Sequence, residues 1–108
     1  MSTYIVFVGL TQKGAADVKK LPIKVKSAAK ILNKAGAKTQ CFYSVMGMDR
    51  YDGFFIVQAV DGEKAAAAAL TLGSQGDMHT NTLRAFTETE LKVKFKGSCS
   101  TILSNSPD

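Results

Sequence analysis

The chain has 108 residues, 45% of them hydrophobic and 21% charged, so it is long enough for one hydrophobic core and has an ordinary globular composition. This composition excludes a disordered chain and a fibre, and no apolar run is long enough to cross a bilayer. The net charge of +5 favours solubility and weak attraction to polyanions, but an excess of this size does not identify a nucleic-acid-binding protein.

The first half of the chain predicts a strand, a helix and a second strand. Residues 3–9 are rich in β-branched and aromatic side chains, and no basic segment precedes them, so they predict a strand and not a signal peptide. Turn and helix-start residues occupy positions 10–17. A helix is expected from near Pro22, which fits only a first turn, to a stop at Gly36. Its buried stripe would be Leu21, Val25, Ala28, Leu32 and Ala35. Residues 38–46 predict the next strand.

The same helix carries a row of lysines on its other side. These are Lys20, Lys24, Lys26, Lys30 and Lys34. An anionic partner would suit such a row, but we interpret it as a solvated helix face, which is the usual place for charged side chains.

The second half repeats the layout. After a hairpin at residues 47–50, a strand is predicted at 52–60, and Asp61 is placed to cap an alanine-rich helix that stops at Gly73. A fourth strand is predicted at residues 78–87. Residues 88–95 could form a short helix or an extra strand. We expect residues 1–95 to form the domain and residues 96–108 a polar C-terminal tail.

The resulting order, βαββαβ, is the α+β ferredoxin-like arrangement, in which a four-stranded antiparallel sheet carries two helices on one face. Three segments also resemble the GYD domain family: Tyr51-Asp52, Leu72-Gly73-Ser74 and the run from Thr80 to Thr87. The resemblance covers roughly residues 3 to 91. It implies a ferredoxin-like fold and a dimeric α/β barrel, but no reaction, because the family has no established biochemical role. Here Gly47 is separated from Tyr51-Asp52, which predicts a longer hairpin.

The first and third strands are apolar on both faces, yet two helices can cover only one face of the sheet. In the third strand Phe54 and Ile56 alternate with Phe55 and Val57. We therefore predict that Phe54 and Ile56 lie in a homodimer interface between two sheets.

A polar set within this apolar surface predicts a small-molecule site. The predicted lining is Tyr43, Asp52, Gln58, Thr80, Thr82 and Arg84. The alternative is a hydrogen-bond network at the dimer interface, with Arg84 paired to Asp52 or to a carboxylate of the tail. The ligand expected here is small and mostly apolar.

No catalytic constellation, cofactor or metal site is predicted. His79 is expected on the helix side or at the rim of the sheet, as a structural or exposed histidine. Tyr51 could donate a phenolic hydrogen bond, although packing with a wet tip is the usual role of such a tyrosine. Cys41 and Cys99 lie far apart without metal-ligand spacing, and we expect reduced thiols.

Three functions remain open at this stage. The first is a cytoplasmic homodimer that binds a small ligand or serves as an interaction module. The second is an enzyme similar to small barrel monooxygenases or isomerases, an analogy of fold alone. The third is RNA binding, which shares the βαββαβ order but is disfavoured, because the lysines lie on a helix behind the sheet. No membrane partner is expected.

Overall fold

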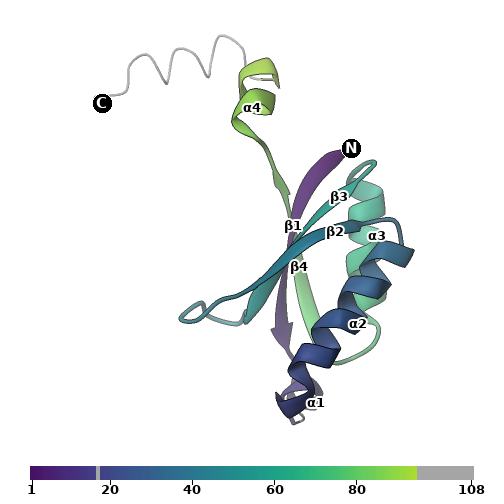
Figure 1. Ribbon diagram of the computed structural model, residues 1–108, viewed down its shortest axis with the longest axis vertical. Helices are drawn as coiled ribbons and strands as arrows, with labels where there is room; N and C mark the ends of the chain where they lie inside the picture. Colours follow the sequence, from purple (N-terminus) through teal and green to yellow (C-terminus); the bar gives the residue numbers. More distant parts are fainter. Residues whose placement is uncertain (17, 95–108) are drawn as a thin grey trace.

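The computed structural model describes residues 1–16 and 18–94, which form one sheet with two long helices packed against it and a short last helix beyond its end (Figure 1). The strands are β1 (Ser2–Leu10), β2 (Lys38–Ser44), β3 (Gly53–Ala59) and β4 (Met78–Ala85). The helices are α1 (Gln12–Ala15), the 3₁₀ turn η1 (Val18–Lys20), α2 (Leu21–Lys34), α3 (Gly62–Gly73) and α4 (Glu88–Lys94). The predicted tail at 96–108 falls outside the described residues, so the domain boundary at residue 95 stays a prediction.

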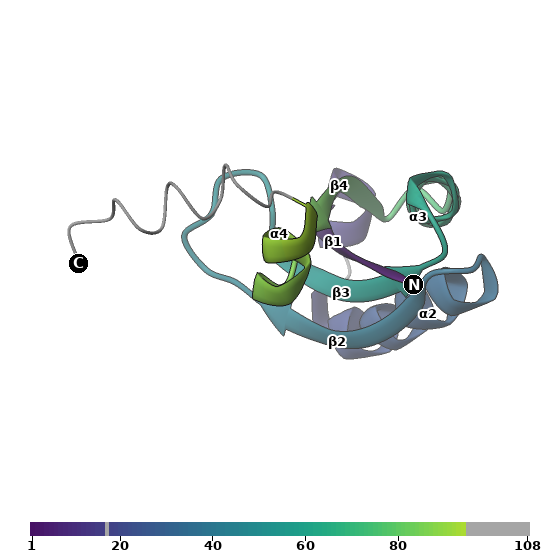
Figure 2. The ribbon, with the colours of Figure 1, turned by 90° about the horizontal axis from the view of Figure 1, so that it is seen from above.

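The sheet is antiparallel throughout and has the strand order β2-β3-β1-β4. The two strands richest in β-branched and aromatic residues, β1 and β3, are the central pair, as expected for strands that are apolar on both faces. The helices α2 and α3 cover the same face of the sheet (Figures 1 and 2). The predicted α+β ferredoxin-like fold is confirmed.

The core lies between the sheet and these two helices. The inward side chains of β3 are buried, with Phe55 and Val57 fully so, and this confirms the predicted faces of the third strand. From β1 the buried side chains are Tyr4, Val6 and Val8. The small residues Ala65, Ala68 and Ala69 form the buried stripe of α3, which lets this helix lie close to the sheet.

Local sequence signals set the ends of both long helices. Pro22 stands in the first turn of α2, where its missing N–H costs no intrahelical hydrogen bond, and Gly36 follows the helix with a φ of 103°. Asp61 caps α3, because its carboxylate accepts a hydrogen bond of 2.9 Å from the amide of Lys64. Both helix boundaries agree with the prediction.

The segment between β1 and α2 is more helical than its turn residues suggested. Thr11 caps the single turn α1, and its hydroxyl accepts a hydrogen bond from the amide of Gly14. The same hydroxyl donates to the carbonyl of Gly76 at 2.6 Å, and so ties this segment to the loop before β4. None of the helices within residues 1–16 and 18–94 combines the length and apolar character that a membrane-crossing helix requires.

Candidate interaction face of the sheet

The face of the sheet opposite α2 and α3, which we call the open face, carries two largely apolar rows that cross all four strands. Residues paired across antiparallel strands point to the same side, so the register assigns each row. The first row contains Tyr43, Phe54, Phe7 and Asn81. The second contains Cys41, Ile56, Ile5 and Leu83.

Aromatic rings in contact extend the first row to both edges of the sheet. The ring centroids of Tyr43 and Phe54 lie 5.5 Å apart, and those of Phe54 and Phe7 lie 5.6 Å apart. From Phe7 the series continues to Tyr51 at 5.8 Å and from Tyr51 to His79 at 5.4 Å. Tilted ring pairs at these separations are favourable. The series therefore fixes the rings in place on the open face.

The open face is apolar at its centre, and the row at one of its margins is mostly polar. One margin is the row of Lys38, Gln58, Thr3 and Ala85. The central side chains are only half-buried, and Tyr43 and Leu83 at the edges are 56% and 47% exposed. An apolar centre with a polar rim is the anatomy of a protein–protein interface.

Of the predicted ligand-lining residues, Tyr43 and Gln58 lie on the open face, together with Phe54 and Ile56 of the predicted interface. Asp52 has a different role. Its carboxylate accepts a 2.9 Å hydrogen bond from the amide of Leu10, and its own amide donates to the carbonyl of Val8 at 2.9 Å. Asp52 thus anchors the hairpin before β3 to the end of β1.

The prediction that Thr80, Thr82 and Arg84 lie on the face away from the helices was wrong. These residues pair with Val8, Val6 and Tyr4, whose side chains are buried on the helix side. The prediction placed polar side chains away from the helices, a rule that fails on an edge strand. On β4 the helix-side positions 80, 82 and 84 are only half-buried, so polar groups there still reach water. The predicted polar lining is therefore not assembled on one face.

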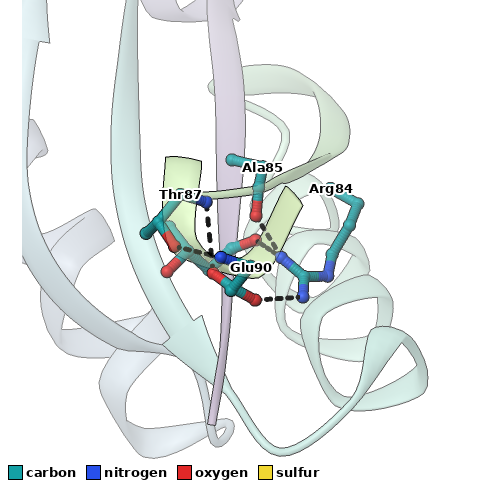
Figure 3. Close-up of polar contacts among 5 residues, drawn as sticks. Arg84, Ala85, Thr87 and Glu90 are labelled. Carbon is teal, nitrogen blue, oxygen red and sulfur yellow. Dashed lines mark hydrogen bonds and ion pairs between the residues drawn. The ribbon is translucent and has the colours of Figure 1, made fainter. Parts of the chain in front are cut away.

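Arg84 joins the end of the sheet to α4 (Figure 3). Its guanidinium pairs with the carboxylate of Glu90 at 2.9 Å and donates to the carbonyl of Thr3 at 3.1 Å and to that of Ala85. It also lies 4.2 Å from the ring centroid of Phe86. Arg84 pairs with Glu90 of α4 and not with Asp52, so the predicted Asp52 pairing was wrong. The predicted pairing with a carboxylate of the tail lies outside the described residues.

The start of α4 is a capping box. The hydroxyl of Thr87 accepts from the amide of Glu90 at 3.1 Å, while the Glu90 carboxylate accepts from the amide of Thr87 at 3.2 Å. This pattern explains why residues 88–94 form a helix and not the extra strand that was the alternative. The hydrogen bond from Arg84, followed by the bond from the Thr87 backbone, lowers the pKa of Glu90.

His79 lies at the rim of the open face, above Gly9 of β1, and not on the helix side. A Cβ atom on Gly9 would overlap the imidazole and the carbonyl oxygen of Arg50, so glycine makes room for both. Sequence reasoning missed the contact of His79 with Tyr51, because only the strand register brings them together. Among the described residues, no three His, Cys, Asp or Glu side chains gather in the way a metal site requires.

The fold and this face define a ferredoxin-like α+β domain with an apolar and aromatic sheet surface that no helix within residues 1–16 and 18–94 covers. The family model of the GYD domain matches residues 4–93, and the chain belongs to the GYD domain family. A relative from Thermus thermophilus is named glutamine synthetase and cystathionine beta-lyase binding protein. It is 34% identical over 97 residues, which cover 89% of this chain and 100% of the relative.

Proposed function

We propose that this protein is a homodimeric protein-binding module, in which two copies pack their open faces together. The main observation that supports a dimer is the pair of largely apolar rows across the open face. Such contiguous apolar surface, rimmed by polar residues, marks an interaction site in a globular protein. A second copy supplies the same apolar surface.

The contacts within the first row favour this arrangement. Phe7, Tyr43 and Phe54 are held by neighbouring rings, so they lose little side-chain freedom when a partner covers them. A twofold interface uses each of these rings twice. Pre-ordered aromatic side chains at the centre of a patch are the usual anchors of a tight interface.

The protein-binding role rests on the relative from Thermus thermophilus, whose whole length is matched by this chain and which is named for two enzymes that it binds. We propose that this chain likewise binds enzymes of amino-acid metabolism. Glutamine synthetase and cystathionine beta-lyase from its own organism are the first partners to test. In a face-to-face dimer the helices α2 and α3 remain on the outside, where a partner can reach them.

The ligand hypothesis is weakened, because only Tyr43 and Gln58 of its lining face the space between two sheets. Native mass spectrometry of the gently purified protein tests dimer and ligand together. We expect twice the chain mass, and any retained ligand would appear as added mass on the dimer. A monomer at micromolar concentration would contradict the proposed pairing.

The binding role is tested with purified enzymes by biolayer interferometry. The immobilised chain should bind glutamine synthetase or cystathionine beta-lyase of its organism saturably and should ignore serum albumin. If the dimer is intact but binds neither enzyme, the proposed partners are refuted and the proposed dimer is not affected.

A further inference from the structure

A groove runs along the seam between α2 and α3 on the side of the molecule away from the open face. Its first part has a volume of about 180 Å³ and reaches from Lys20 of η1 and Ile23 of α2 to Leu72 on α3 and Met78 on β4. A second part of about 260 Å³ continues toward Lys34 and Thr71. Ile31 and Gln75 line both parts, so the two parts adjoin each other along the seam, and together they are called the groove.

The floor of the groove is apolar and the walls carry lysines. Ile31, Leu72 and Met78 contribute to the floor, and Ile23 stands beside them with 65% of its surface exposed. The lysines along the groove are Lys20, Lys24 and Lys34. The carboxylate in its lining, that of Asp77, lies 3.9 Å from the ammonium group of Lys24. The groove therefore offers apolar contact and positive charge together.

The charge around the groove comes from one stretch of sequence. Between Asp17 and Asp49 the chain has no acidic residue, yet this stretch holds half of the 14 basic residues. The remaining basic residues are outnumbered by the 9 acidic ones, so this stretch supplies the whole net charge of +5. Lys34 lines the groove, whereas Lys26 and Lys30 are exposed on α2 outside its lining, and none of the three has a carboxylate partner among the described residues. Like charges in such a row repel one another, and an anionic partner removes that cost.

We infer that the groove between α2 and α3 docks an acidic, amphipathic segment of a protein partner. Apolar side chains of the segment would pack on Ile23 and Ile31, and its carboxylates would pair with the lysines of the walls. This inference rests on the proposed protein-binding role and names the surface that performs it.

A protein fits this groove better than a nucleic acid. The lining has neither an aromatic side chain on which a base could stack nor an arginine that could bind a phosphate in bidentate fashion. An apolar floor between cationic walls instead matches one face of an amphipathic helix.

The test uses a fluorescein-labelled helical peptide of about 18 residues, with leucine at every third or fourth position and glutamate between, long enough to follow α2. Binding to the intact chain is measured by fluorescence anisotropy at low and moderate salt. The two groove variants are Ile23→Ser and Lys34→Glu, with Lys34→Gln as a milder second charge variant. Their matched controls are Leu70→Ser, which removes an apolar side chain that is 74% exposed on α3, and Lys92→Glu on α4.

We expect saturable binding by the wild type that weakens with salt. Ile23→Ser and Lys34→Glu should each weaken binding about tenfold, Lys34→Gln about threefold, and both controls less than about twofold. Equal losses in groove and control variants would overturn the inference. A uridine oligonucleotide of about 20 nucleotides that displaces the peptide and binds more tightly than the peptide would also overturn the inference. That result would favour a nucleic-acid partner.

The same preparations separate this inference from the proposed function. A dimer that binds glutamine synthetase or cystathionine beta-lyase but ignores the peptide, and whose enzyme binding survives Lys34→Glu, would refute the groove alone. A chain that binds the peptide through the groove but binds neither enzyme would refute the proposed partners and support the groove.

Discussion

The substitution Phe54→Glu tests the dimer most directly, because Phe54 stands in the first row between Tyr43 and Phe7. Full burial of a phenylalanine is worth about 1.5–3 kcal/mol, and roughly half of that remains to be gained, since the side chain is half-buried in one chain. Because a twofold interface contains Phe54 of both copies, this loss of burial free energy occurs twice in each dimer. An unpaired carboxylate buried in each copy costs several kcal/mol more. The dimer should therefore weaken by at least about 5 kcal/mol, or more than a thousandfold in dissociation constant.

Sedimentation equilibrium over a range of concentrations measures this change. The variant should be monomeric where the wild type is dimeric, and far-UV circular dichroism should stay unchanged, because Phe54 lies outside the core between sheet and helices. Leu70→Glu is the matched control, since it places the same charge on an exposed apolar position of α3. A Phe54→Glu chain that remains dimeric would refute the open face as the interface. A wild-type monomer would favour the RNA-binding hypothesis, in which the aromatic sheet is exposed.

Three further predictions concern the fold itself. Phe55→Ala should lower the free energy of unfolding by about 3–5 kcal/mol in urea titrations, because Phe55 is fully buried, and a loss below about 1 kcal/mol would contradict its place in the core. Asp61→Ala should cost about 1 kcal/mol through loss of the α3 cap, measured by the same titration, whereas Asp61→Asn should retain most of that stability. The lowered pKa of Glu90 means that its contacts with Arg84 and Thr87 contribute fully above the ordinary value of 4.5 and are lost as pH falls through the folded pKa. The Thr87 amide resonance should thus titrate with a midpoint below 4.5, and Glu90→Gln should abolish that titration.

The central strands of the sheet could be predicted closely from sequence. In β3, Gly53, Phe55 and Val57 alternate with Phe54 and Ile56. The first set includes a glycine, which lets the helices pack close to the strand, so the sequence predicts that this set faces the helices. The ends of helices α2 and α3 could be predicted from sequence equally well. A capping carboxylate and a glycine in the left-handed region act within a few residues, so they depend little on the rest of the fold.

The edge of the sheet could not be predicted in the same way. On β4, polarity does not report the face, because Thr80 and Thr82 lie on the helix side and Leu83 is exposed on the open face. Their direction depends on the register with β1, which alternation within one strand cannot supply. The Thr87–Glu90 capping box was visible in the sequence, and it would have decided between helix and strand at residues 88–95.

The placement of both long helices, α2 and α3, on one face of the sheet has a consequence for stoichiometry. If the bare faces of two copies meet, their helix layers point in opposite directions, and two docking grooves are presented on opposite ends of one particle. Such a particle cannot enclose a single small partner between its two grooves. It would instead link separate molecules, so an enzyme with several subunits should form extended, concentration-dependent assemblies with it and should dissolve them again when the dimer is in excess.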